Sequence, residues 1–421
     1  MREITNLNDA VRALTEFVPS SRSTSPYTLD RMRALLAFFG NPQDKLRIIH
    51  VAGTSGKTST SYYTAALLHV IGQKVGLTVS PHVVAVNDRV QINLLPLPEA
   101  EFCRDLGEFL KHIKSSGITP SYFELLVALA YWEFARQEVN YAVVEVGLGG
   151  LVDGTNVVNR ADKVCIITDI GLDHVNVLGH TLAEIASQKA GIIQPHNAVF
   201  VHRQADEVLD VIQKVCERQA ATLHIIEPQE ISAELSFLPL FQQRNFTLAQ
   251  AAANYVIERD HLPELKPSQM IRAAQTNIPA RMEVFHHDEK TIILDGAHNP
   301  QKLHALIESI RAQFSDQPVA AVISFAAGDE YRLAGALQEI TRLCQHIIIT
   351  SFSGKQDEPK SSIKTEILAK LLDQQDFHNY EIIAEPEQAF TTLLARPEPL
   401  LLTTGSFYLL NHIRPLMLEA V

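Results

Sequence analysis

The chain has 421 residues, of which 46% are hydrophobic and 20% are charged, and its formal net charge at pH 7 is −12. This length is typical of two or three domains with ample hydrophobic cores. An acidic chain lacks the basic field that a nucleic-acid surface needs, so we expect no nucleic-acid partner. An anionic substrate would have to be held by local cations.

The cysteines and the apolar segments bear on the compartment. The four cysteines are scattered without C-x-x-C spacing, which predicts reduced thiols and argues against a zinc site. The N-terminus lacks the apolar core of a signal peptide. The most apolar run, residues 125–135, is too short to span a membrane and contains Glu133. We therefore expect a cytoplasmic protein without a membrane partner.

A phosphate-binding loop is predicted at the end of the first apolar strand, residues 48–52. The loop consists of Gly53, Thr54, Ser55, Gly56, Lys57, Thr58 and Ser59. Glycines let the backbone approach a polyphosphate, and the helix that follows offers free N–H groups. Lys57 can reach the outer phosphates and the Thr58 hydroxyl can bind Mg²⁺. An ordinary glycine-rich turn is the alternative, but Lys57, Thr58 and the preceding strand all stand where phosphate binding needs them.

Strand and helix patterns alternate through the first part of the chain. Strands are predicted over 48–52, 75–79, 141–146, 164–168, 198–201 and 222–226, and helices over 59–72, 123–136 and 182–190. This alternation predicts an α/β fold with a doubly wound, mostly parallel sheet. Ligands bind at the carboxyl ends of such strands. The phosphate loop, Ser80, Glu145 and residues 169–174 each follow a strand, so we expect them to converge on one edge.

The pattern breaks around residues 279–290, where a polar stretch over 286–290 precedes a new strand. New strands are predicted over 291–294, 319–324, 347–350, 380–384 and 400–403. We therefore expect two domains, a phosphate-loop domain over 1–288 and a smaller, Rossmann-like α/β domain over 289–421.

Four polar residues could carry chemistry, three of them after predicted strands and the fourth, Lys189, in a predicted helix just before Gly191. Glu145 ends an apolar strand, where a carboxylate is costly unless paired or metal-bound, so it is a candidate Mg²⁺ ligand with a salt bridge as the alternative. Ser80 could supply a hydroxyl. A lone histidine such as His174 is more often a loop or core residue than a metal ligand. The preference of Mg²⁺ for oxygen ligands argues further against a ligand role. Lys189 alone is typical of a solvated surface lysine.

A set of short motifs occurs in one order along nearly the whole chain. The motifs lie at 51–59, 80–82, 122–124, 145–150, 171–174, 189–192, 281–283, 294–300 and 404–409. Among them are Ser80-Pro81-His82, Gly171-Leu172-Asp173-His174 and Asp295-Gly296-Ala297-His298-Asn299-Pro300. Together they resemble the folylpolyglutamate synthase/dihydrofolate synthase family of the Mur-ligase superfamily.

The resemblance implies an activity and its substrates. It implies an ATP-dependent ligase that adds L-glutamate to a folate carboxylate through an acyl phosphate, with dihydropteroate as a further acceptor in bifunctional members. ATP and Mg²⁺ are the implied cofactors, and we expect a monomer. The first domain would bind ATP, and the second would close over it and bind glutamate.

The resemblance also implies roles for individual residues. ATP would be bound by residues 53–59 and by Asn245, Arg281, Asp295 and His298. Mg²⁺ ligands would be Thr58, Ser80, Glu145, His174 and, after carbamylation, Lys189. The pterin region would include Phe123, Glu124 and Asp153. The implied catalytic residues are Lys57, Lys189 and His174.

Two other functions stay open at this point. A Mur-type ligase acting on a UDP-sugar peptide would need a nucleotide-sugar domain before the phosphate loop, where only about fifty residues stand. A nucleotide-binding module without ligase activity has no need of a second metal, which Glu145, His174 and Lys189 together suggest. The identity of the acceptor is not decided by these motifs.

Overall fold

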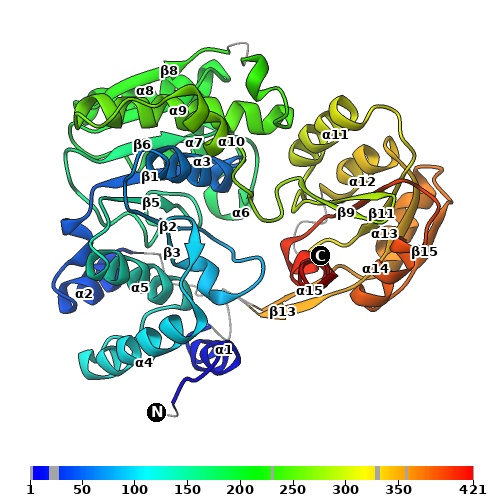
Figure 1. Cartoon of the computed structure of the whole chain (residues 1–421), viewed down its shortest axis with the longest axis horizontal. Coiled ribbons are helices and arrows are strands. Elements are labelled where there is room, and N and C mark those ends of the chain that lie inside the picture. Colours follow the sequence, from blue (N-terminus) through cyan, green and yellow to red (C-terminus); the bar gives the residue numbers. More distant parts are fainter. Residues whose placement is uncertain (1–2, 19–27, 229–231, 328–331, 356–358, 421) are drawn as a thin grey trace. The chain divides into compact units, whose positions relative to one another are not determined.

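The computed structural model describes residues 3–18, 28–228, 232–327, 332–355 and 359–420. The chain forms two compact units (Figure 1). Unit 1 comprises Met1–Ser236 and Gln242–Thr276, and unit 2 comprises Phe237–Phe241 and Asn277–Val421. Each unit contains its own central sheet.

Unit 1 is built on an eight-stranded sheet of order β4-β3-β2-β5-β1-β6-β7-β8. The strands are β1 (Ile48–Ala52), β2 (Val75–Thr78), β3 (Gln91–Ile92), β4 (Leu95–Pro96), β5 (Tyr141–Glu145), β6 (Val164–Ile167), β7 (Ala198–His202) and β8 (Thr222–Ile226). All pairs from β2 to β8 are parallel, whereas β3 and β4 pair antiparallel at one edge. The predicted doubly wound, mostly parallel sheet is confirmed.

Helices cover both faces of this sheet. They are α1 (Leu7–Thr15), α2 (Asp30–Phe38), α3 (Lys57–His69), α4 (Glu99–Ser116), α5 (Tyr122–Arg136), α6 (Val175–Leu178), α7 (Leu182–Ala190), α8 (Asp206–Arg218), α9 (Leu240–Arg259) and α10 (Pro267–Ala274). Short 3₁₀ turns are η1 (Pro42–Lys45), η2 (Val86–Arg89) and η3 (Ala233–Leu235). One face packs on α2, α4 and α5 and, further along, on α7 and α8. Strands β1, β2, β5, β6 and β7 are buried throughout, because helices cover them on both sides.

Unit 2 contains a six-stranded sheet of order β15-β12-β11-β16-β10-β9. Its elements are β9 (Glu283–His287), β10 (Lys290–Leu294), α11 (Pro300–Phe314), β11 (Val319–Ile323), α12 (Leu333–Thr341), β12 (Cys344–Ile349), β13 (Ser353–Lys355), β14 (Pro359–Ser361), α13 (Thr365–Gln374), β15 (Tyr380–Ile382), α14 (Pro386–Leu394), β16 (Leu400–Thr404) and α15 (Phe407–Ala420). Strands β13 and β14 form a separate two-stranded ribbon. The sheet is parallel except for β9.

Strand β9 was not expected from the sequence. It pairs antiparallel with β10 at the edge of the sheet, so the main segment of unit 2 begins at Asn277, ahead of the expected division at 288/289. Its first residue, Glu283, is buried, and the remaining residues alternate between exposed and partly buried. An edge strand of this kind carries polar side chains, which is why residues 286–287 read as a linker.

Three further findings bear on earlier expectations. Helix α3 begins at Lys57 rather than at residue 59, because Gly56 at its N-cap adopts a left-handed φ of 89°. All four cysteines are buried free thiols. Among the residues that the structure describes, none of the helices combines the length and apolar character needed to cross a bilayer.

Three acidic side chains meet between α4 and α5. Carboxylate oxygens of Glu101, Asp105 and Glu133 lie within 4.8 Å of one another. Arg136 donates to Glu133 at 2.9 Å, and Arg104 donates to Asp105 at 2.8 Å. Burial and the neighbouring Asp105 carboxylate raise the pKa of Glu133 from its ordinary value of 4.5 to about 7.

Replacement of Glu133 by glutamine is expected to remove part of the pH dependence of stability. The folded-state pKa lies above the unfolded value, so the folded protein binds more protons between about pH 4.5 and 7 and this contribution to stability is lost as the pH rises through that window. At pH 8 the Glu133→Gln variant should therefore be more stable than wild type, by roughly 1 kcal/mol after allowance for solvent screening. Thermal melts at pH 5 and pH 8 measure this. Glu108→Gln, at an exposed position of α4, is the control, and a destabilised Glu133→Gln variant at pH 8 would contradict the expectation.

Candidate active site

The phosphate loop follows β1 and cannot carry side chains at two of its positions. Gly53 has a φ of 153°, and a Cβ there would lie 1.7 Å from Thr168 Oγ1. A Cβ at Gly56 would lie 2.2 Å from Asn245 Oδ1 on α9. These close approaches explain both glycines, and the second places the Asn245 side chain against the loop. The ATP contact that the resemblance implies for Asn245 stays a prediction.

The loop backbone is anchored by the segment after β6. The amides of Thr54 and Ser55 both donate to the carbonyl of Asp169, at 2.9 and 3.2 Å. Thr168 Oγ1 donates to the carbonyl of Ser55 at 2.6 Å. Arg244 in turn holds the Asp169 carboxylate through bonds of 2.7 and 2.8 Å. The amides of residues 54 and 55 are therefore occupied by protein.

The first turn of α3 is suited to an anion. Among the described residues, no side chain caps this helix at Gly56. Its first amides stand at the positive end of the helix dipole. Ser59 is 1% exposed and lies inside the turn, where it shapes the helix end. A phosphate group fits this helix terminus.

Two lysines converge on one carbonyl of the loop. Lys57 Nζ donates to the Gly53 oxygen at 3.1 Å, and Lys189 Nζ donates to the same oxygen at 2.8 Å. Lys189 on α7 is only 4% exposed, so it is not a solvated surface lysine. Two ammonium groups at one point make a locally positive spot in an otherwise acidic chain.

Three of the expected Mg²⁺ ligands come together at the carboxyl ends of the strands. Thr58 Oγ1 donates to Glu145 Oε1 at 2.9 Å, and the amide of Ser80 donates to Glu145 Oε2 at 3.3 Å. Glu145 is 3% exposed. The buried Glu145 carboxylate and the partly buried Thr58 hydroxyl offer hard oxygen donors, so this set fits Mg²⁺. The sequence predicted that the segments after these strands would converge on one edge of the sheet. The hydrogen bonds to Glu145 show that Thr58, Ser80 and Glu145 do so.

His174 is placed differently from these three residues. It stands at the N-cap of α6 with a left-handed φ of 49°, and its side chain is 52% exposed. Its Nε2 lies 3.8 Å from Asp173 Oδ1. A ligand role for His174 therefore stays a prediction, since its observed contact is with a neighbouring carboxylate.

The residues expected in the pterin region, Phe123, Glu124 and Asp153, all belong to unit 1. Glu124 accepts from the amide of Ser121 and from Arg31 Nε, at 2.8 and 2.7 Å, and so caps α5. A Cβ at Gly147 would lie 2.5 Å from the Phe123 ring. Asp153 is buried and accepts from the amide of Leu148 at 2.8 Å. Glu124 and Asp153 are thus engaged in holding local backbone.

In unit 2, the three expected ATP contacts cluster at the end of β10. Asp295 accepts from the amides of Met282 and Ala297, both at 2.7 Å. Burial raises the pKa of Asp295 to about 6, against the opposing effect of Arg281. The Arg281 guanidinium lies 4.2 Å from the centre of the Phe407 ring.

His298 stands beside this group. Its Nδ1 lies 2.8 Å from the Gly296 carbonyl and its Nε2 lies 3.0 Å from Lys302 Nζ. Lys302 and Phe407 were not assigned from the sequence. Lys302 lies on the first turn of α11, four residues after His298, which precedes the N-cap Asn299. This short separation in the sequence was the available signal.

Several residues that shape the phosphate loop were also not assigned, namely Thr168, Asp169 and Arg244. Residues 169–174 were expected at the ligand edge, but Arg244 lies on α9, a helix that was not among those expected.

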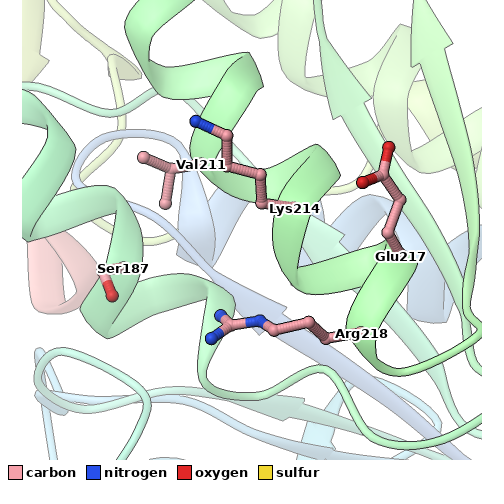
Figure 2. Close-up of a pocket in the computed structure, with 5 residues that line it drawn as sticks. All are labelled: Ser187, Val211, Lys214, Glu217 and Arg218. Atoms are coloured by element: carbon pink, nitrogen blue, oxygen red, sulfur yellow. The ribbon is translucent and has the colours of Figure 1, made fainter.

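A separate hollow of about 660 Å³ lies between α7 and α8. Figure 2 shows its lining residues, Ser187, Val211, Lys214, Glu217 and Arg218. None of them belongs to the expected site.

Comparisons with known proteins show which family this chain resembles. The family described as "Mur ligase middle domain" matches residues 51–253, and that described as "Mur ligase, glutamate ligase domain" matches residues 280–407. The dihydrofolate synthase/folylpolyglutamate synthase of Bacillus subtilis is 29% identical, over 92% of this chain and 94% of its own length. The folylpolyglutamate synthase of Lacticaseibacillus casei is 30% identical over the same shares.

The comparison with solved structures covers nearly the whole chain. A Mycobacterium tuberculosis folylpolyglutamate synthase, complexed with ADP and AMPPCP, matches with a TM-score of 0.84 and 25% identity. The match covers 99% of each chain. The similarity therefore extends over both compact units.

Proposed function

Because the chain belongs to the folylpolyglutamate synthase/dihydrofolate synthase family of Mur ligases, we propose that it joins L-glutamate to the carboxylate of a folate or dihydropteroate with ATP as the energy source. The observation that carries this proposal is the group formed by Thr58, Ser80 and Glu145 beside the phosphate loop. A buried carboxylate and a hydroxyl next to a helix N-terminus suit a metal–polyphosphate substrate.

The residues of unit 1 have distinct tasks in this reaction. The α3 amides and Lys57 would hold the terminal phosphates of ATP and offset the charge that develops there. Thr58, Ser80 and Glu145 would hold Mg²⁺, which supplies Lewis-acid charge stabilisation at the phosphates when bound. Asn245, packed against Gly56, would contact the nucleotide. The implied roles of His174 and of a carbamylated Lys189 are part of the same proposal.

The chemistry proceeds in two displacements. An oxygen of the acceptor carboxylate attacks the γ-phosphorus of ATP, the bond to the β-phosphate oxygen breaks, and ADP leaves. The glutamate ammonium loses a proton, its nitrogen attacks the acyl carbon, and phosphate leaves with the electron pair of the broken carbon–oxygen bond. The nitrogen then loses a second proton to give the amide. No covalent bond to the protein is formed.

Unit 2 supplies the remaining parts of the proposal. Residues 289–421 would bind glutamate and close over ATP, with Arg281, Asp295 and His298 facing the nucleotide. Exclusion of water would protect the acyl phosphate from hydrolysis. A monomeric, cytoplasmic enzyme without a nucleic-acid partner stays a prediction.

A screen of acceptors tests the proposed function. Phosphate release and product mass are measured with ATP, Mg²⁺ and L-glutamate against dihydropteroate, tetrahydrofolate and a UDP-sugar peptide. We expect glutamate-dependent release with a folate-type acceptor and a product heavier by one glutamyl residue. Release with the UDP-sugar peptide alone would favour the Mur-type alternative, and release that ignores glutamate would contradict ligase activity.

Replacement of Arg281 by alanine is expected to weaken ATP use with little effect on thermal stability. Its guanidinium is held over Phe407, and a planar cationic fork suits phosphate oxygens. We expect kcat/KM for ATP to fall on the order of 100-fold. Arg281→Lys, which keeps the charge but not the fork, should recover only part of the loss. A variant that unfolds, while its folded fraction binds ATP normally, would show that Arg281 is structural.

A further inference from the structure

A buried chain of polar side chains links the strand before the phosphate loop to the loop after Glu145. His50 lies in the middle of β1 and is 1% exposed. Its Nε2 is 2.8 Å from Thr155 Oγ1, which is 2.5 Å from Asp153 Oδ1. Asp153 Oδ2 accepts from the amide of Leu148 at 2.8 Å. Four groups thus connect two segments that are far apart in the sequence.

The direction of the hydrogen bonds follows from the donors available. Asp153 also accepts from the amide of Thr155 at 3.0 Å, and as a carboxylate it can only accept. The single hydroxyl proton of Thr155 is therefore given to Asp153, and the Thr155 oxygen must accept from His50. This assigns the proton of the neutral imidazole to Nε2. Burial, with the Lys163 ammonium, lowers the pKa of His50 well below 6.5, which agrees with a neutral ring.

A buried histidine at position 50 costs free energy of folding, so the hydrogen bond from its Nε2 to Thr155 needs an explanation. Among the described residues, His50 Nδ1 has no hydrogen-bond partner although it is buried. An unpaired buried ring nitrogen costs free energy that an apolar residue would avoid. The only polar contact made by the ring within the described part of the chain is thus the one to Thr155. The arrangement is explained if the Nε2–H group serves to fix the Thr155 hydroxyl.

This series of hydrogen bonds ends at the Leu148 amide, in the turn that begins two residues after Glu145. Within this turn Gly149 and Gly150 have φ values of 71° and 154°, so its backbone needs external support. The Asp153–Leu148 bond supplies that support, and Tyr131 braces Thr155 from behind by donating to its carbonyl at 2.9 Å. The Phe123 ring packs against Gly147 and Gly154. The supported turn therefore forms the surface beside Phe123.

We infer that His50 and Thr155 are positioning residues that hold the turn over residues 147–152 and thereby orient the acceptor relative to Glu145. This inference rests on the proposed function, because it takes the surface beside Phe123 as the acceptor site. His50 acts through Thr155 and Asp153, and neither His50 nor Thr155 needs to touch the substrate. Loss of the hydroxyl should loosen the turn and leave the phosphate loop in place.

The test compares variants that remove or keep the hydroxyl. Thr155→Val has nearly the same shape without the hydroxyl, whereas Thr155→Ser keeps it. Thr64→Val is the matched control, since Thr64 is a buried threonine on α3 whose hydroxyl bonds the Thr60 carbonyl. At His50, glutamine can present a donor near the Nε2 position and leucine cannot. The threonine pair keeps the inference testable if His50→Leu does not fold.

The first readout needs no activity. Hydrogen exchange of the Leu148 amide in the full chain should be about tenfold faster in Thr155→Val than in wild type, because the loss of roughly 1.4 kcal/mol of protection corresponds to that factor. Thr155→Ser and Thr64→Val should keep the wild-type rate. Unchanged exchange in Thr155→Val would overturn the anchoring, whether or not the proposed acceptor is right.

The second readout separates positioning from general damage. With the acceptor that supports turnover, Thr155→Val and His50→Leu should raise the acceptor KM by about tenfold and leave the ATP KM within about twofold. Thr155→Ser and His50→Gln should recover most of the loss. Equal changes in both KM values, or an unchanged acceptor KM with faster exchange, would overturn the positioning role. Absence of turnover in wild type with every folate acceptor would refute the proposed function, and the exchange result would then still decide the anchoring.

Discussion

Replacement of Lys57 by alanine is expected to lower ATP turnover by at least about 100-fold while the fold survives. The Lys57 ammonium bonds the Gly53 carbonyl on the rim of the phosphate loop, and it belongs to the first turn of α3 rather than to the core. It would neutralise charge that builds up on the transferred phosphoryl group, so its loss falls mainly on kcat. Phosphate release measured at saturating ATP and acceptor checks this.

A second lysine gives the matched control for this experiment. Lys214 on α8 lines the separate hollow between α7 and α8 (Figure 2). Lys214→Ala should keep near-wild-type turnover, and thermal melts should show both variants folded. Near-wild-type turnover by Lys57→Ala would contradict the assignment of the phosphate loop. A large loss of ATP turnover in Lys214→Ala would instead indicate that the hollow between α7 and α8 takes part in the reaction.

Replacement of Lys189 by alanine is expected to abolish most of the activity, which short-chain carboxylates should partly restore. Lys189 is buried and points at the Gly53 carbonyl. The proposed carbamate forms when the neutral amine attacks CO₂ and a proton is released, which replaces a cation by an anionic oxygen ligand. Acetate or formate can enter the space left in Lys189→Ala and supply such an oxygen. Turnover with and without added carboxylate is the measurement.

The rescue has to be specific to Lys189. Acetate should not restore Lys57→Ala, because Lys57 acts as a cation. Labelled bicarbonate should give a carbonyl signal on Lys189 in wild type and no such signal in Lys189→Ala. A free ammonium on Lys189 in an ATP-bound structure at adequate bicarbonate would refute the carbamate.

The parts of the site that sequence predicts well are local or follow from strand order. The phosphate loop is one continuous segment, so its glycines and Lys57 are visible together. Thr58, Ser80 and Glu145 could be expected to meet because parallel strands end at one edge. Their hydrogen bonds bear this out.

The contacts that sequence did not predict are between side chains and distant backbone. The bonds from Thr168 to Ser55, and from Arg244 to Asp169, depend on how β6 and α9 pack against the loop. The burial of Lys189 likewise depends on the packing of α7, so a lysine beside Gly191 looked solvated. Strand β9 was missed because His286 and His287 made its second half resemble a polar linker. The buried chain from His50 has no local pattern at all, since β1 otherwise reads as an apolar strand.

The most direct test of the account follows the oxygen atoms of the acceptor. The folate-type acceptor is labelled with ¹⁸O in the reacting carboxylate and incubated with ATP, Mg²⁺ and unlabelled L-glutamate. An acyl phosphate intermediate predicts that each glutamyl product forms together with one phosphate that carries a single ¹⁸O atom, while the other label stays in the new amide. Unlabelled phosphate released alongside the amide, or phosphate release without addition of glutamate, would contradict the proposed ligase.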